Sequence, residues 1–177
     1  LQTGDLDIAS TDHAAMRMVP EDKAREVAAC FGHDVNPPPV NDDTPHDANG
    51  NRLMPVLPPG GVETRFPLLY AKGVKTGRLS LERWIDVCCA APARLFDLKH
   101  KGQLAPGFDA DIVIFDPNKR HTYSVENLHS NTDYSVWEGW EVDGKVEKTF
   151  SRGRMIVDGD KFLGSADHGA YLHRFVG

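Results

Sequence analysis

The feature that most constrains the fold is a short apolar run that ends on three polar residues. Leu6, Ile8 and Ala9 form a run typical of a buried strand, and Thr11-Asp12-His13 follows it. A carboxylate and an imidazole at the edge of a buried strand are costly unless they have a task or a partner. In α/β barrels, catalytic groups lie at that edge. Asp12 is therefore the first candidate site residue, although an Asp just past a strand is also typical of a helix N-cap or a turn.

Length and composition limit the kind of protein. The chain has 177 residues, of which 40% are hydrophobic and 26% are charged, as in ordinary globular proteins. The formal net charge is -6 and there is no long basic run, which disfavours nucleic acid or an anionic membrane as partner. No apolar stretch reaches the roughly 20 residues of a membrane span, and no signal peptide is visible. We therefore expect a cytoplasmic protein.

The cysteine positions argue against a disulfide framework, and the histidine positions argue against a self-contained metal site. The three cysteines are Cys30, Cys88 and Cys89, an odd number with two adjacent residues, which is typical of reduced thiols in apolar packing. The eight histidines are scattered, and neither an HxH nor a CxxC motif occurs. The sequence therefore does not carry a complete metal site of its own.

The first hundred residues predict helices around a long irregular segment. Within 14–60, a helix is expected from Pro20 to Phe31, and the remainder is rich in Pro, Asn, Asp and Gly. Such a long loop is either one wall of a pocket or a mobile insertion. Helical spacing returns from Val62 to Tyr70.

A strong amphipathic pattern marks the next helix, for which Ser80 is the expected N-cap. Its predicted core face consists of Leu81, Trp84, Ile85, Cys88 and Cys89. A separate short helix is expected over Ala93 to Leu98, after Pro92. In the helix before it, Glu63 and Arg65 are predicted to be ion-pair or capping groups rather than catalysts.

The pattern changes to β structure after about residue 101. Ala110 to Phe115 predicts a buried strand closed by Asp116-Pro117, and Lys145 to Arg152 alternates as a further strand does. Met155 to Phe162 predicts a hairpin that turns at Asp158-Gly159. These strands are too few for a self-sufficient sandwich, just as the strand before Asp12 and its helices are too few for a barrel.

Two segments resemble enzymes of the amidohydrolase superfamily. Gly102 to Asp116 is similar to the segment by which these enzymes return from their barrel to a small β domain. Thr11-Asp12-His13 resembles the Ser/Thr-Asp-His at the end of the last barrel strand.

Two further segments narrow the resemblance to the dihydropyrimidinase and D-hydantoinase family, the cyclic amidases. Gly61 to Arg65, followed by Leu68-Leu69-Tyr70, is similar to one stretch of that family. Asp133-Tyr134, with Trp137 to Val142 after it, is similar to another.

The resemblance implies a fold of class α/β plus β. Residues 1–101 would be the last strand and helices of a (β/α)8 TIM barrel, including the long loop 14–60. Residues 102–163 would be part of a small β-sandwich domain, and 164–177 a C-terminal tail. The barrel would need the missing N-terminal half as a partner, and the complete protein is expected to be a homo-oligomer, a dimer or a tetramer.

The resemblance also implies a reaction, the hydrolytic opening of a small cyclic amide such as a dihydropyrimidine or a hydantoin. The complete enzyme would hold two divalent metal ions, usually zinc, bridged by a carboxylated lysine that this chain does not contain. Asp12 would ligate one metal and transfer the proton of the attacking hydroxide to the departing ring nitrogen. His13 would not ligate a metal and would at most lie next to the metal ligands. A backbone group near Leu57 would hold the ring amide.

Two alternatives to an enzyme remain open. The chain lacks the family's HxH pair and its other metal histidines, so it is expected to be inactive alone. A non-catalytic relative, similar to the dihydropyrimidinase-related scaffold proteins, would keep the fold and lose the metals. A stand-alone β-rich interaction module would keep only a remnant of the barrel. The presence of Asp12 favours the enzyme over the scaffold, because a scaffold has little need for a metal carboxylate.

Overall fold

The structure, a computed structural model, describes residues 9, 18–30, 44–54 and 61–172. These residues fall into two compact units. The first unit contains residue 9, residues 64–121 and residues 141–172. The second unit contains residues 18–30, 44–54, 61–63 and 122–140.

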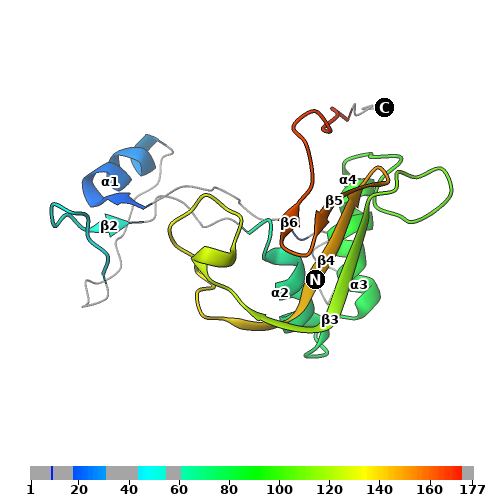
Figure 1. Cartoon of the computed structure of the whole chain (residues 1–177), viewed down its shortest axis with the longest axis horizontal. Helices are drawn as coiled ribbons and strands as arrows, with labels where there is room; N and C mark the ends of the chain where they lie inside the picture. Colours follow the sequence, from blue (N-terminus) through cyan, green and yellow to red (C-terminus); the bar gives the residue numbers. More distant parts are fainter. Residues whose placement is uncertain (1–8, 10–17, 31–43, 55–60, 173–177) are drawn as a thin grey trace. The chain divides into compact units, whose positions relative to one another are not determined.

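In the first unit, helices lie against one face of a four-stranded sheet (Figure 1). The strands, in their order across the sheet, are β3 (Ile112–Thr122), β4 (Glu141–Ser151), β5 (Arg154–Asp158) and β6 (Lys161–Phe162). β4, β5 and β6 are antiparallel neighbours, with Ser151 opposite Arg154 and Asp158 opposite Lys161. The predicted hairpin of β5 and β6 is therefore confirmed, with its two turn residues one position later than expected.

Two helical stretches pack on this sheet. The first is α2 (Arg65–Leu69), which continues as a π-helical turn η1 (Tyr70–Val74). The second runs without a break through α3 (Leu81–Ile85), a π-helical turn η2 (Asp86–Ala90) and α4 (Ala91–Leu95). Ser80 is its N-cap as predicted, because its Oγ accepts a hydrogen bond from the Arg83 backbone N–H at 3.1 Å.

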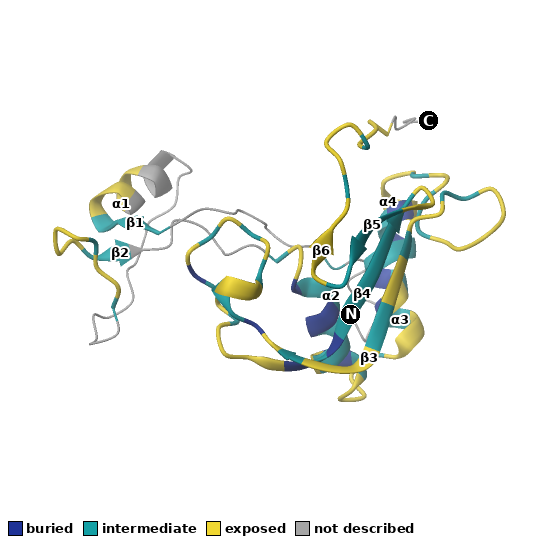
Figure 2. Ribbon diagram, in the orientation of Figure 1, coloured by how far each residue is buried: buried dark blue, intermediate teal, exposed yellow. Residues whose placement is uncertain are grey.

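Four aromatic rings form the contact between the helices and the sheet. Phe66, Tyr70 and Trp84 from the helices surround Phe115 of β3, with ring centroids 4.9–5.7 Å from it. Trp84 is only 2% exposed, and its indole N–H donates to the Phe66 carbonyl at 3.1 Å. Figure 2 shows further buried stretches in α2 and α4. Large buried rings contribute much of the burial energy of a small core, and the satisfied indole removes the cost of burying a polar group.

Gly144 of β4 is the point where the sheet backbone meets this aromatic cluster. Its φ is +101°, and a Cβ there would lie 2.4 Å from Phe115 Cζ and 2.7 Å from Tyr70 Cδ1. Only glycine fits such close approach of backbone and rings.

We predict that Gly144→Ala destabilises the protein by about 3 kcal/mol, since it adds both a clash and backbone strain. The free energy of unfolding in urea measures this. Gly107→Ala is the matched control, because Gly107 has a φ of +89° with open space around it, so only the strain of about 1 kcal/mol applies. Equal losses for the two variants would contradict the packing role of Gly144.

The buried face of the second helical stretch differs from the predicted one. Trp84, Val87 and Ala91 are buried, whereas Leu81 and Ile85 are 53% and 41% exposed. Spacings of three and four residues put Trp84, Val87 and Ala91 on one line. Leu81 lies in the exposed first turn, and Ile85 lies to the side of the line. The predicted separate helix after Pro92 is also wrong, because the helix passes through it.

The predicted end of β3 at Asp116-Pro117 is wrong as well, since the strand continues to Thr122. β3 lies at the end of the strand order in the described sheet, and a proline without an N–H is tolerated on the free side of an edge strand. Its expected burial also fails, because Val113 and Ile114 are each 47% exposed.

An ion cluster fixes the loop between α4 and β3. Lys101 Nζ lies 2.7 Å from Asp109 and also contacts Asp111, which accepts the Arg152 N–H at 2.8 Å. Burial lowers the pKa of Lys101, but its hydrogen bonds to Asp109 and Asp111 outweigh this and raise it. Burial raises the pKa of Asp111, but the hydrogen bonds from Lys101 and the Arg152 N–H outweigh this and lower it.

We predict a pH-dependent contribution of Asp111 to stability. A carboxyl whose pKa is lower in the folded state stabilises the protein above its unfolded value of 3.8, and this is lost as pH falls through the folded pKa. Asp111→Asn should therefore lower the free energy of unfolding by about 1 kcal/mol at pH 7. The difference should shrink in urea titrations at about pH 3. A difference that stays constant would contradict the ionic contribution.

The second unit contains α1 (Glu21–Cys30) and a two-stranded antiparallel sheet of β1 (Val19–Pro20) and β2 (Leu53–Met54). The predicted helix is thus confirmed. Its start differs, because Pro20 ends β1 and the helix begins at Glu21. β2 lies in the segment for which a long loop is predicted. The carboxylate of Asp47 accepts the Asn49 and Asn51 N–H groups at 2.8 Å and closes a turn just before β2.

The second unit also contains the connection between β3 and β4. A 3-10 turn, η3 (Val125–Asn127), begins at Ser124 with a capping box formed by Ser124 and Asn127. Tyr123 is 3% exposed and Tyr134 is 8% exposed, so this connection has a small core of its own.

Candidate functional site

The three residues that the sequence analysis places in the site, Asp12, His13 and Leu57, lie outside the described residues. Their roles stay predictions. The described residue nearest to Asp12 in the sequence on its N-terminal side is Ala9, and its position in the first unit is fixed by two contacts. Its N–H donates to the Val87 carbonyl at 3.1 Å, and its carbonyl accepts from Arg65 Nη1 at 2.9 Å.

The Gly61 to Arg65 motif divides into residues with different tasks. Glu63, in the second unit, accepts the His129 backbone N–H and the His129 ring Nδ1–H, each at 2.8 Å. Its predicted ion-pair role agrees with these contacts. Thr64 is 1% exposed, and its carbonyl accepts the Leu68 N–H at 3.0 Å in the first turn of α2. The described partner of Arg65 is instead a backbone carbonyl, that of Ala9.

The adjacent thiols of Cys88 and Cys89 are half-buried beside Arg65. Burial raises the pKa of Cys88 to about 11, against a smaller lowering by the Arg65 guanidinium. Burial also raises the pKa of Cys89. A nucleophilic cysteine needs a lowered pKa, so this geometry favours packing over covalent catalysis, as the sequence predicts.

We predict that Cys88 reacts slowly with iodoacetamide. Its alkylation rate should rise about tenfold per pH unit up to about pH 11, because only the thiolate reacts. Peptide mass spectrometry of the folded protein measures this, with the urea-unfolded chain as the control that levels off near an ordinary thiol pKa. A plateau between pH 8 and 9 in the folded protein would contradict the burial argument.

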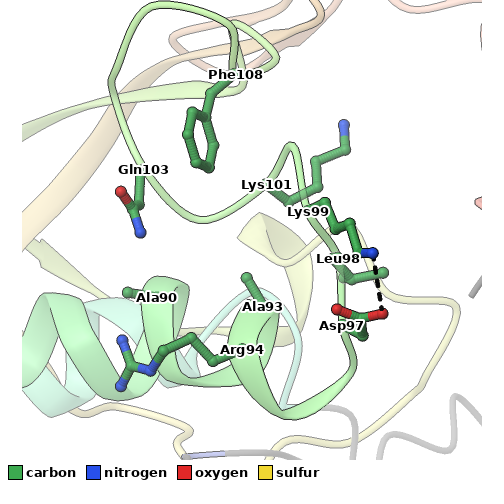
Figure 3. Close-up of a pocket in the computed structure, with 9 residues that line it drawn as sticks. All are labelled: Ala90, Ala93, Arg94, Asp97, Leu98, Lys99, Lys101, Gln103 and Phe108. Atoms are coloured by element: carbon green, nitrogen blue, oxygen red, sulfur yellow. Dashed lines mark ion pairs between the residues drawn. The ribbon is translucent and has the colours of Figure 1, made fainter. Parts of the chain in front are cut away.

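The first unit also has a cavity of about 180 Å³ between α4 and the loop that follows it (Figure 3). Its lining includes Phe108, Ala93 and three cationic side chains. Each cation forms an ion pair with a carboxylate. Arg94 pairs with Asp86 at 2.8 Å and Lys99 with Asp97 at 4.0 Å, while Lys101 belongs to the ion cluster. The charges among its described lining residues are therefore engaged in ion pairs.

The described residues form neither a cluster of metal-binding side chains nor a membrane-spanning helix. They contain no group of three or more His, Cys, Asp or Glu side chains placed to hold a metal ion. No helix in the described part of the chain has the length and apolar character needed to cross a membrane.

The sequence pattern of the amidohydrolase family matches residues 4–156. The chain belongs to this family. The matched range includes Asp12 and the helices and sheet of the first unit up to β5. Membership confirms the resemblance of the Gly102 to Asp116 segment to this group of enzymes.

Individual relatives narrow the resemblance within the amidohydrolase family. The D-phenylhydantoinase of Escherichia coli O1:K1 is 48% identical over 115 residues, which cover 64% of this chain and 25% of that protein. The D-hydantoinase of Bacillus sp. AR9 is 45% identical with a TM-score of 0.63, covering 67% of this chain and 27% of that one. The D-hydantoinase (dihydropyrimidinase) of a Thermus species is 31% identical with a TM-score of 0.72, covering 98% and 33%.

These relatives confirm the resemblance to the dihydropyrimidinase and D-hydantoinase proteins. The chain spans only about a quarter of the length of the curated relatives that it matches. The family and the solved hydantoinases imply a TIM-barrel enzyme fold, to which these residues contribute a portion. The predicted division into barrel and β-sandwich at residue 101 stays a prediction.

Proposed function

We propose that this chain is part of a metal-dependent hydrolase that opens the C–N bond of a cyclic amide, such as a dihydropyrimidine or a hydantoin. The observation that carries the proposal is the 48% identity to a D-phenylhydantoinase over 115 residues. The D-hydantoinases among the solved structures support the same substrate class. In this proposal, residues 1–101 belong to the barrel and 102–163 to a β-sandwich, and the complete protein forms a dimer or a tetramer.

Asp12 is the residue of this chain to which the proposal gives a chemical role. The oxygen of a water molecule attacks the ring carbonyl carbon, and the ring C–N bond breaks. Asp12 takes a proton from that water and delivers it to the departing nitrogen, which leaves an open-chain carboxylate. His13 lies next to the metal ligands without binding a metal itself. The backbone near Leu57 hydrogen-bonds the ring amide.

The proposal includes two divalent metal ions, with zinc as the expected metal. Asp12 offers one oxygen ligand, and the carboxylated lysine and the histidine ligands come from outside this chain. When bound, such ions polarise a carbonyl and lower the pKa of water towards ~7. One carboxylate does not hold two metal ions, so the chain alone is expected to be inactive.

A non-catalytic scaffold is the second candidate. It would share the family fold and bind no metal. Asp12 counts against it, because a scaffold has no use for a metal-ligating carboxylate at the end of a strand.

The first measurement is the intact mass of the protein expressed from its complete coding sequence, together with its metal content. We expect about two metal ions per chain and hydrolysis of hydantoin or dihydrouracil. A mass of 19.6 kDa without metal and without hydrolysis would instead favour the scaffold.

We predict that Asp12→Ala lowers the turnover of the ring substrate at least about 100-fold, since proton transfer and a metal ligand are lost together. Steady-state kinetics with hydantoin measures the effect. Asp167→Ala is the control, because Asp167 is an exposed carboxylate of the C-terminal segment and should leave turnover unchanged. Undiminished turnover of Asp12→Ala would refute the role given to Asp12.

A further inference from the structure

The cavity beside α4 lies between two small side chains and one aromatic ring. Ala90 and Ala93 line it from the second helical stretch, and Phe108 lines it from the loop, with its ring pointing toward the helix (Figure 3). An apolar cavity of about 150 Å³ holds one benzene ring. This cavity measures about 180 Å³ and therefore has room for one ring with a small substituent.

Contacts within the first unit fix the loop that covers the cavity. Lys101 Nζ lies 2.7 Å from Asp109, and the Asp109 N–H donates to the His100 carbonyl at 2.9 Å. Gly102 lies directly against the helix, because a Cβ at this position would be 2.6 Å from the Cβ of Ala93. A site with a fixed shape loses little free energy in ordering itself when a ligand binds.

Arg94 supplies positive charge to the cavity. Its Nη2 donates to Asp86 Oδ1 at 2.8 Å, while Asp86 Oδ2 accepts from Arg83 Nη1 at 2.8 Å. One carboxylate is thus shared by two guanidinium groups. A guanidinium has five N–H donors, and the bond to Asp86 uses one of those of Arg94. The Arg94 side chain is 61% exposed, so an anion has access to it.

Gln103 adds a neutral donor to the same part of the cavity lining. Its amide and the Arg94 guanidinium lie on the left of Figure 3, whereas Lys99 and Asp97, which pair with each other, lie on the right. The amide has two N–H donors, and Gln103 is exposed on the loop. A carboxylate has two acceptor oxygens, so it can accept from an amide and a guanidinium at the same time.

We propose that this cavity binds a small aromatic carboxylate. The ring lies between Phe108 and the methyl groups of Ala90 and Ala93, where it gains apolar contact and ring stacking. The carboxylate accepts hydrogen bonds from Arg94 and Gln103, and bonds between ionised groups are the strong ones. The inference is independent of the proposed function, because these five residues have no role in it.

The test is the affinity of para-fluorobenzoate for the complete protein, measured from the width of its fluorine NMR signal. The matched neutral ligand is para-fluorobenzyl alcohol, which has the same ring and no charge. We expect the benzoate to bind at least about tenfold more tightly than the alcohol, because only the benzoate forms charge-assisted hydrogen bonds. Equal affinities for the two ligands would overturn the role given to the carboxylate.

Gln103→Glu tests where the carboxylate lies. The two side chains have the same size and the position is exposed, so the fold is expected to persist. A like charge beside the ligand should weaken binding of the benzoate at least about tenfold and leave the alcohol within about threefold. Asn118→Asp is the matched control, since it adds the same charge at an exposed position of β3 in the same unit. Equal losses in the two variants would contradict a specific site at Gln103.

Arg94→Gln tests the charged donor. We expect benzoate binding to weaken at least about tenfold, with Arg78→Gln, a change at an exposed arginine of the same unit, leaving it unchanged. Full benzoate affinity in Arg94→Gln would place the ligand elsewhere in the complete protein and overturn the proposal. Because Arg94→Gln also removes an ion pair with Asp86, its melting temperature is measured without ligand. If this variant unfolds, the result for Gln103→Glu decides the proposal.

Discussion

The packing of three aromatic side chains around Phe115 is the interaction on which the first unit depends. β3 supplies Phe115, α2 and η1 supply Phe66 and Tyr70, and α3 supplies Trp84, so one cluster joins β3 to both helical stretches. Gly144 lets the backbone of β4 approach the same cluster. Because the helices are fixed in this way, Arg65, the first residue of α2, and Val87, which lies in η2 after α3, have defined positions.

Local chemistry made part of this fold predictable from the sequence. Ser80 is a cap because its side chain can accept a neighbouring N–H, and the turn at Gly159 follows from a glycine between two short strands. Prediction failed where the tertiary environment decides. Pro117 does not end β3 because that strand lies at the edge of the described sheet, and Leu81 is exposed because the buried line runs through Val87. Periodicity alone contains neither fact.

The site was predictable only in part, for a similar reason. Asp12 is conspicuous because a carboxylate follows an apolar run in the sequence, and this needs no knowledge of the rest of the protein. The contact of Arg65 with Ala9 joins residues 56 positions apart and leaves no local pattern. One signal was present in the sequence, namely Pro92, which denies a helical partner to the carbonyl five residues earlier. That signal becomes meaningful only once the helix is known to continue through the proline.

The π-helical turn at Asp86–Ala90 has a consequence for how this protein tolerates insertions and deletions. Removing one residue from the turn would restore ordinary α-helical pairing and give the Val87 oxygen a partner within its own helix. The helix would then gain a bond at the expense of the contact with Ala9. The irregular turn thus leaves one carbonyl oxygen free to bind Ala9. The length of the turn therefore constrains a contact with a residue 78 positions away in the chain.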